Sequence, residues 1–287
     1  VERACTNLEV HLNGHRLYRA GRMQEPVTRN CYQPQLVALP AALLRAQDNT
    51  LDLKLRGHAL EHVASRQRAA GLSALRIGPM AALAPVWRTQ EFWNVTAPQL
   101  LGVTLFVLGV FMIGVGWFNR RASYLMYFGT MSIIWSLLTA RIWFVDLPIS
   151  NRAAEFLVTF GFAPIAGFAI VFLLRYARVK RRPIDFALIA QCFVMPLSLA
   201  LLGPERLYAG VTFWYWVLGL ELLGATAVYL RVSWSDQRTE FWVMSAILVL
   251  LACMVALEVA LHAAAGGIWR GHALRFAFPV FVLVVSF

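Results

Sequence analysis

Long apolar runs fill the chain after residue 97 and constrain its fold more than any other feature. Six complete runs follow one another and a seventh begins near the end: residues 98–118, 123–145, 156–176, 184–202, 207–230, 241–261 and 276–287. The complete runs approach the roughly 20 residues that a helix needs to cross the hydrocarbon core of a bilayer. The sequence therefore predicts an all-α polytopic membrane bundle of seven helices over residues 96–287. About 95 residues of a different character precede it.

Both ends of the sequence indicate part of a longer protein. The chain opens on Val1 instead of Met and carries no signal peptide of its own. The run 276–287 stops in mid-span. We therefore expect a truncated seventh helix and further sequence on both sides.

The composition favours a membrane protein over a nucleic-acid-binding one. Hydrophobic residues make up 59% of the chain and charged residues 14%, against about 45–50% and 25% in soluble domains. The formal net charge is +11, but the basic residues are spread through the N-terminal part and gathered in the loops between apolar runs. That distribution is typical of orientation signals. We expect the lipid bilayer as a partner, and no nucleic acid.

The short loops predict the orientation in the membrane. If residues 1–95 lie outside, the inner loops carry nine basic residues, namely Arg120, Arg121, Arg175, Arg178, Lys180, Arg181, Arg182, Arg231 and Arg238. The outer loops carry four, Arg152, Arg206, Arg270 and Arg275, or five with Arg141. Because cytoplasmic loops are enriched in Lys and Arg, residues 1–95 are predicted to lie outside and the C-terminus inside.

The first 95 residues have the pattern of short strands. Residues 7–12 alternate between apolar and polar, and the Asn13-Gly14 pair that follows is a strong hairpin signal. Residues 50–56 alternate again, and short apolar runs cover residues 36–39 and 72–77. Short strands separated by turn residues are typical of a β-sandwich. Four strands are few for a complete sandwich, so we expect a partial one.

Three stretches resemble the second half of a galactose-binding-like jelly roll: VHLNG at residues 10–14, PQLVALP at 34–40 and NTLDLKL at 49–55. A jelly roll followed by seven membrane helices is similar to the architecture of the bacterial 7TM-DISM receptors, which are seven-transmembrane receptors with diverse intracellular signalling modules. The resemblance covers nearly the whole chain.

This resemblance implies a membrane sensor region of a bacterial signal-transduction protein. Residues 1–95 would be a periplasmic sensor domain, and residues 96–287 would lie in the inner membrane. The C-terminus would be cytoplasmic. Family members end in a histidine kinase or a diguanylate cyclase, neither of which is present here, and we expect a homodimer formed through that missing domain. The ligand is unknown. Jelly rolls often bind carbohydrate, which is an analogy of fold alone.

Cys5 and Cys31 are the cysteines of the predicted outer domain. A disulfide persists in an oxidising compartment, where an unpaired exposed thiol is a liability. The sequence therefore favours a Cys5–Cys31 disulfide. The alternative is two unrelated thiols.

Glu221 and Glu258 are the acids placed most deeply in the apolar runs. A charge in the membrane is costly, so such residues face the bundle interior, pair with another group or become protonated. Arg141, near the outer end of the second run, is a candidate partner. The alternative is a structural role as polar contacts between helices. Both readings stay open, and these three residues are the signalling candidates.

Catalytic motifs are missing from the sequence. It contains no Gly-rich phosphate loop, no GxSxG, no HExxH and no CxxC. His58 and His62 have the i, i+4 spacing of metal ligands, but a zinc site needs three or four ligands, so we expect no metal and no cofactor. The parent protein would be an enzyme only through a kinase or cyclase domain.

Two classes of function remain. A signalling receptor would pass an extracytoplasmic signal through the helices to an output domain. A transporter or an integral membrane enzyme would use the β-domain as an accessory. Transporters usually have broken helices and polar substrate contacts near the bilayer midplane. The runs here contain Pro164 and Pro196 but few polar groups, which favours the receptor.

Overall fold

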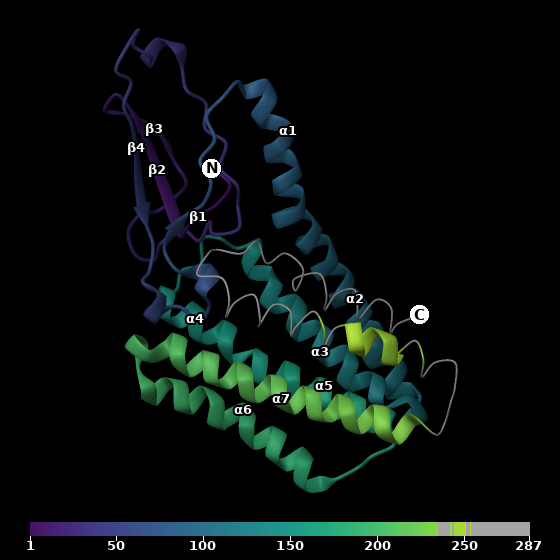
Figure 1. Cartoon of the computed structure of the whole chain (residues 1–287). Helices are drawn as coiled ribbons and strands as arrows, with labels where there is room; N and C mark the ends of the chain where they lie inside the picture. The colour runs from purple at the N-terminus through teal and green to yellow at the C-terminus, as the bar shows by residue number, and fades with distance from the viewer. Residues whose placement is uncertain (235–241, 243, 251–252, 254–287) are drawn as a thin grey trace. The chain divides into compact units, whose positions relative to one another are not determined.

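The computed structural model of the chain describes residues 1–234, 242, 244–250 and 253, and divides into two compact units (Figure 1). The β-containing unit comprises Val1–Gln99, Arg141–Leu157 and Leu202–Ala209. The helical unit comprises Leu100–Ala140, Val158–Leu201 and the described residues from Gly210 onward. Two segments that contain loops and helix ends, 141–157 and 202–209, therefore belong with the strands.

Five short strands form two antiparallel sheets in the β-containing unit. The strands are β1 (Ala4–Cys5), β2 (Asn7–Leu12), β3 (His15–Arg19), β4 (Leu51–Arg56) and β5 (Gly71–Leu72). One sheet has the order β3-β2-β4, and the other pairs β1 with β5. Asn13 and Gly14 both have positive φ, at 52° and 85°, as a two-residue hairpin turn between β2 and β3 requires. The predicted strands at 7–12 and 50–56 and the predicted hairpin are confirmed.

The alternation in β2 explains the small core of this unit. Leu8, Val10 and Leu12 are buried on one face of the strand, whereas Glu9 and His11 are half-buried on the other. Tyr18, Val37, Leu51 and Leu53 are among the partly buried residues that pack against Leu8 and Val10. Apolar area removed from water stabilises this arrangement by about 25 cal/mol per Å².

One strand prediction was wrong, and another was right only at its first residue. Residues 36–39 form no strand. Only Leu72 of the run 72–77 belongs to one, because the pairing with the start of the chain ends after Ser73 N–H donates to Arg3 O (2.9 Å) and Glu2 N–H donates to Ala74 O (3.2 Å). The described residues therefore contain small N-terminal β-sheets, and a jelly roll is not shown.

Five helical segments among the described residues are long and apolar enough to cross a membrane: Met80–Phe118, Tyr124–Ile142, Asn151–Tyr176, Arg182–Leu202 and Pro204–Ser233. They contain the helices α1 (Met80–Glu91), α2 (Ala97–Phe118), α3 (Tyr124–Thr139), α4 (Asn151–Phe160), α5 (Phe162–Tyr176), α6 (Arg182–Leu202) and α7 (Leu207–Ser233). Five such segments indicate a membrane protein. Most of the predicted run 241–261 and all of 276–287 lie outside the described residues, so seven helices are not shown.

The sequence did not predict α1. Residues 79–95 were expected to belong to the β-domain, but α1 begins at Met80 and continues through the π-helical turn η4 (Phe92–Thr96) into α2 (Figure 1). The helical segment is 39 residues long. The helical segment Met80–Phe118 therefore begins among residues that belong to the β-containing unit.

Aromatic rings form the centre of the helical unit. Phe128 of α3, Phe172 of α5 and Tyr229 of α7 are fully buried. The ring centroids of Phe128 and Phe172 are 4.9 Å apart, and those of Tyr176 and Tyr229 are 5.9 Å apart. Large apolar residues such as Phe118 and Leu201 are exposed on the outside of this unit. Such a surface suits contact with lipid tails.

A seam of small residues joins α2 to α3. Gly102, Gly109 and Gly116 recur every seven residues in α2. A Cβ atom at Gly109 would lie 2.7 Å from Gly129 O, and one at Gly129 would lie 2.5 Å from Gly109 O. At Gly102 the helices are joined by Ser136 Oγ, which donates to Gly102 O (2.7 Å). Backbones this close need residues without side chains, as is common between membrane helices.

We predict that Gly109→Ala destabilises the helical unit while Gly114→Ala does not. The added methyl at Gly109 collides with backbone, and overpacking of this kind costs about 1–3 kcal/mol. Gly114 lies in the same helix and has no atom within 4 Å of its Cβ position, so it is a matched control. Thermal unfolding of both variants in lipid nanodiscs measures the difference. Equal melting temperatures for the two variants would contradict the seam.

Candidate functional site

The loop residues 22–29, which follow β3, make the first contact with the segment 141–157. Thr28 Oγ1 donates to Asp146 Oδ1 (2.5 Å) and accepts from Arg22 N–H (2.8 Å). The Arg22 guanidinium lies 3.5 Å from the same carboxylate oxygen. The backbone N–H of Arg29 donates to Val145 O (3.0 Å). The loop after α3 is therefore held in two ways. Arg29 N–H makes a backbone hydrogen bond to it, and its Asp146 carboxylate contacts both the Thr28 hydroxyl and the Arg22 guanidinium.

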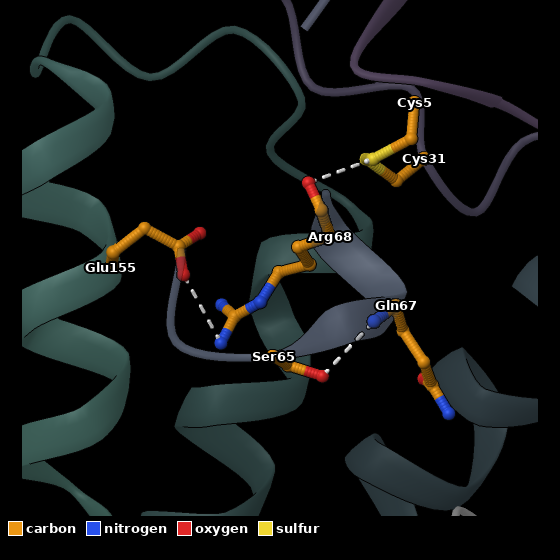
Figure 2. Close-up of a disulfide and its surroundings, with 6 residues drawn as sticks. All are labelled: Cys5, Cys31, Ser65, Gln67, Arg68 and Glu155. Atoms are coloured by element: carbon orange, nitrogen blue, oxygen red, sulfur yellow. Dashed lines mark hydrogen bonds and ion pairs between the residues drawn. A yellow bond between two sulfur atoms is a disulfide. The ribbon is translucent and has the colours of Figure 1, made fainter. Parts of the chain in front are cut away.

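The second contact is buried and centres on Glu155 in α4. Its Oε2 accepts from the backbone N–H of Ala64 (2.8 Å). Figure 2 shows its ion pair with Arg68, whose Nη2 lies 3.3 Å from the same oxygen. The side chains are only 4% and 10% exposed, for Glu155 and Arg68 respectively. Removing one member of a buried ion pair leaves an uncompensated charge, which typically costs 3–5 kcal/mol. Glu155 is therefore an anchor between residues 64–68 and the start of the α4–α5 span.

A short 3₁₀ turn presents Arg68 to this carboxylate. The turn η3 (Arg66–Arg68) is capped by Ser65, whose Oγ accepts from Gln67 N–H (3.3 Å; Figure 2). A serine in this position satisfies a backbone N–H that the short turn leaves free. The cap fixes the backbone from which the Arg68 side chain extends towards Glu155.

Cys5 and Cys31 form a disulfide next to Arg68. Their Cα atoms are 4.2 Å apart and both residues are buried. Cys5 Sγ lies 3.3 Å from Arg68 O (Figure 2). This is a contact and not a hydrogen bond, because a disulfide sulfur carries no proton. The bridge links β1 to the segment that contains Thr28 and Arg29. It therefore connects the residues that contact Asp146 with the region around Arg68, which contacts Glu155.

His58 and His62 do not share a helix face. His62 ends the 3₁₀ turn η2 (Leu60–His62), and its Nδ1–H donates to Pro204 O (3.2 Å). His58 precedes that turn, and its Nε2 lies 3.6 Å from Glu25 Oε1. Burial lowers the pKa of the His58 imidazole, while Glu25 and Glu155 act in the opposite sense. Within the described residues, His62 thus connects to the segment before α7.

The structure gives the predicted intramembrane residues separate neighbours. Arg141 lies over the ring of Tyr32, with 5.8 Å between Cζ and the ring centroid, a cation–π distance. Glu221 of α7 accepts from Gln191 Nε2 of α6 (2.9 Å). Glu258 lies outside the described residues. The carboxylate of Glu221 is therefore paired with an amide.

A second polar contact lies one heptad away from the first on the same two helices. Trp214 Nε1–H donates to Ser198 Oγ (2.8 Å). Ser198 follows Gln191 by seven residues in α6, and Trp214 precedes Glu221 by seven in α7. The two helices are thus antiparallel neighbours whose register is marked by two side-chain hydrogen bonds, a common form of contact between membrane helices.

An apolar groove of about 350 Å³ opens between the three-stranded sheet and α1. Trp87 of α1 lines it, and its Nε1–H donates to Pro34 O (2.9 Å). Gln35, which accepts from the hydroxyl of Tyr18, is among the few polar residues. The remaining lining residues are Val1, Glu2, Val10, Leu36, Val37, Ala38, Leu39, Leu51, Leu53, Ala74, Leu75, Arg76, Ile77, Gly78, Met80, Leu83, Val86 and Gln90. The volume falls in the range of small-molecule sites.

The comparisons with known proteins give no match. No family model fits the chain, and neither a curated protein nor a solved structure is significantly similar to it. The function is therefore argued from the geometry of the chain itself.

Sequence reasoning missed the anchor at Glu155. Glu155 directly precedes the apolar run 156–176, where a charge is expected simply as the flank of a membrane helix. Arg68 lies in a polar stretch with several basic residues, and nothing in its spacing distinguishes it. Only the fold brings the two residues together, across 87 positions of sequence.

We predict that Glu155→Gln loosens residues 60–68 while Glu61→Gln leaves them unchanged. The glutamine keeps an acceptor for Ala64 N–H but leaves Arg68 buried without a counter-charge. Glu61 is exposed and serves as the control. Hydrogen–deuterium exchange of the chain in nanodiscs measures the effect, and we expect exchange of this segment to accelerate at least tenfold, since loss of a buried partner costs 3–5 kcal/mol. Unchanged protection in Glu155→Gln would contradict the anchor.

Proposed function

We propose that this chain is the sensor region of a bacterial membrane receptor of the 7TM-DISM type. Its β-containing part senses an extracytoplasmic signal, and its helices pass that signal to a cytoplasmic histidine kinase or diguanylate cyclase. The observation that carries the proposal is the buried Arg68–Glu155 contact. An accessory domain needs only a flexible linker to its membrane helices. Here buried polar groups hold residues 64–68 of the β-containing unit against α4, which leads into a candidate membrane span.

The distribution of basic residues supports a periplasmic β-domain in the inner membrane of a bacterium. The loops on the proposed cytoplasmic side carry nine basic residues against four on the other side. The segments 141–157 and 202–209, which belong to the β-containing unit, are both on the proposed outer side. The charge bias and the contacts of the β-sheets therefore favour the same orientation.

Two routes could carry the signal. A ligand in the groove would touch both the sheet and α1, and α1 is continuous with the first membrane span. A shift at Arg68 or Asp146 would act on α4 or on the loop after α3. In both cases a local change outside the membrane becomes a displacement at a helix end. The ligand stays unidentified, and the mainly apolar lining gives little support for the carbohydrate expected from the jelly-roll resemblance.

Glu221 is the proposed polar switch within the helices. A carboxylate in hydrocarbon is disfavoured by at least about 2.5 kcal/mol on insertion scales, and here it is held by Gln191. A repacking of α6 against α7 that breaks this contact would change the energy of the bundle by a comparable amount. Such a difference shifts a two-state equilibrium by more than tenfold.

We predict that Glu221→Gln changes basal signalling, whereas Glu205→Gln does not. Glu205 is an exposed residue in the 3₁₀ turn before α7, so it controls for loss of an acid near the same helix. The chain is fused to a histidine kinase module with a transcriptional reporter, and output is read in cells with equal membrane levels of each variant. We expect at least a threefold change for Glu221→Gln, since amide–amide pairing replaces a charge-assisted hydrogen bond.

Wild-type output from Glu221→Gln would remove Glu221 from the mechanism. Output that responds to none of the variants at Glu221, Glu155 or Asp146 would contradict the receptor proposal itself. Solute uptake by proteoliposomes of the unfused chain would then support the alternative, a transporter.

A further inference from the structure

The loop between α5 and α6 is closed in a fixed conformation. The N–H of Arg178 donates to Arg175 O (3.0 Å), and the N–H of Val179 donates to Leu174 O (2.8 Å). Arg178 has a φ of +58°. These are the bonds and the left-handed residue that often end a helix, and the left-handed position is usually occupied by glycine.

Asp185, the acid nearest to this loop, is paired with Arg175. Arg175 Nη2 donates to Asp185 Oδ2 (2.5 Å), and its Nη1 donates to Val179 O (3.1 Å). Asp185 is the single acid between residues 175 and 185. This ion pair therefore joins the end of α5 to the start of α6 and neutralises Asp185 within the loop itself.

Four cations remain on the surface of the loop. Arg178, Lys180, Arg181 and Arg182 are all exposed, within five residues of sequence. Arg178 keeps a large cationic side chain at a backbone position where glycine costs less energy. A non-glycine residue in this conformation is a reason to look for a function of its side chain.

The loop also lies where lipid headgroups would be. It connects two membrane-spanning segments, Asn151–Tyr176 and Arg182–Leu202. Directly after the cations, α6 exposes Phe186, Ile189 and Phe193, which are 74%, 59% and 70% exposed. Their spacing places them along one side of the helix. A row of apolar side chains for the acyl tails thus continues from a group of cations at the level of the headgroups.

We propose that the Arg178–Lys180–Arg181–Arg182 cluster binds the headgroups of anionic phospholipids. The lipid and the protein surface match in two respects. The negative phosphate lies at the level of the cations, and the acyl chains lie along the apolar residues of α6. The closed loop fixes the backbone that carries these cations, so little backbone ordering is needed on binding. This inference requires only that α5 and α6 cross a membrane, and it does not depend on the receptor proposal.

The test compares Arg178→Gly with Arg178→Lys in the full chain. Glycine removes the cation and suits the left-handed backbone, whereas lysine keeps the charge and the strain. Protein from nanodiscs that contain phosphatidylglycerol and phosphatidylcholine in equal amounts is examined by native mass spectrometry for retained lipid. We expect Arg178→Gly to retain about fivefold less phosphatidylglycerol, a factor that corresponds to the typical contribution of one cation near a charged membrane. Arg178→Lys should behave as wild type.

Thermal unfolding separates this result from misfolding. In pure phosphatidylcholine, Arg178→Gly should melt at the same or a higher temperature than wild type, because glycine relieves the backbone. Neutralising Lys180, Arg181 and Arg182 as well should abolish the preference for phosphatidylglycerol, and Arg45→Gln in the β-containing unit should not change it. Unchanged lipid retention in the fourfold variant, or equal loss with Arg45→Gln, would overturn the proposal.

Discussion

The β-containing unit depends on the contacts that the buried carboxylate of Glu155 makes with Ala64 and Arg68. A charge out of water is stable only when hydrogen bonds and an opposite charge replace its hydration. Ala64 N–H and Arg68 supply both, and Arg68 is positioned by a capped turn beside the Cys5–Cys31 disulfide. This carboxylate of α4 thereby holds residues 64–68, and together with the contacts of Thr28 and Arg29 it accounts for the grouping of residues 141–157 with the β-containing unit.

The helical unit is stabilised by a different kind of interaction. Lipid tails are as apolar as leucine, so burial of apolar area does little to hold membrane helices together. Close backbone approach and polar contacts take its place. Gly109 and Gly116 supply the close approach for α2 and α3, and Ser136 adds a hydrogen bond at Gly102. The pairs Gln191–Glu221 and Ser198–Trp214 supply polar contacts for α6 and α7. In both helix pairs the contacts recur at seven residues, the repeat of the helix surface that faces a neighbour.

Local patterns were predictable from the sequence, and long-range pairings were not. The strands at 7–12 and 50–56 and the hairpin at Asn13-Gly14 follow from alternation and from turn preference. The apolar runs up to residue 230 correspond to the described spans, because a continuous apolar segment has few other solutions. The prediction of a strand over 72–77 was too long, because a strand needs a paired neighbour and the pairing of this segment ends at Ala74. The helix from Met80 was hidden because Pro85 lies inside it, and proline normally argues against a helix interior.

The candidate site shows the same division. The cysteines could be paired on grounds of compartment, and Glu221 stood out as an acid in an apolar run. Glu155 and Arg68 could not be recognised in the sequence, because neither has a distinctive local pattern. Their role follows only from the fact that the fold buries them against each other. The apolar groove was missed for a similar reason, since its walls are joined by the Trp87–Pro34 hydrogen bond across 53 positions.

A double-mutant cycle tests most directly whether the Arg68–Glu155 contact transmits the state of the β-sheets to the membrane helices. Reporter output is measured for the chain fused to a kinase module, with Glu155→Gln made in both the wild-type and the Arg68→Met background. If the two residues act through one contact, Glu155→Gln changes output in the wild-type background and has little further effect once Arg68 is gone. An effect of Glu155→Gln that is equally large in both backgrounds, or absent from both, would contradict the account.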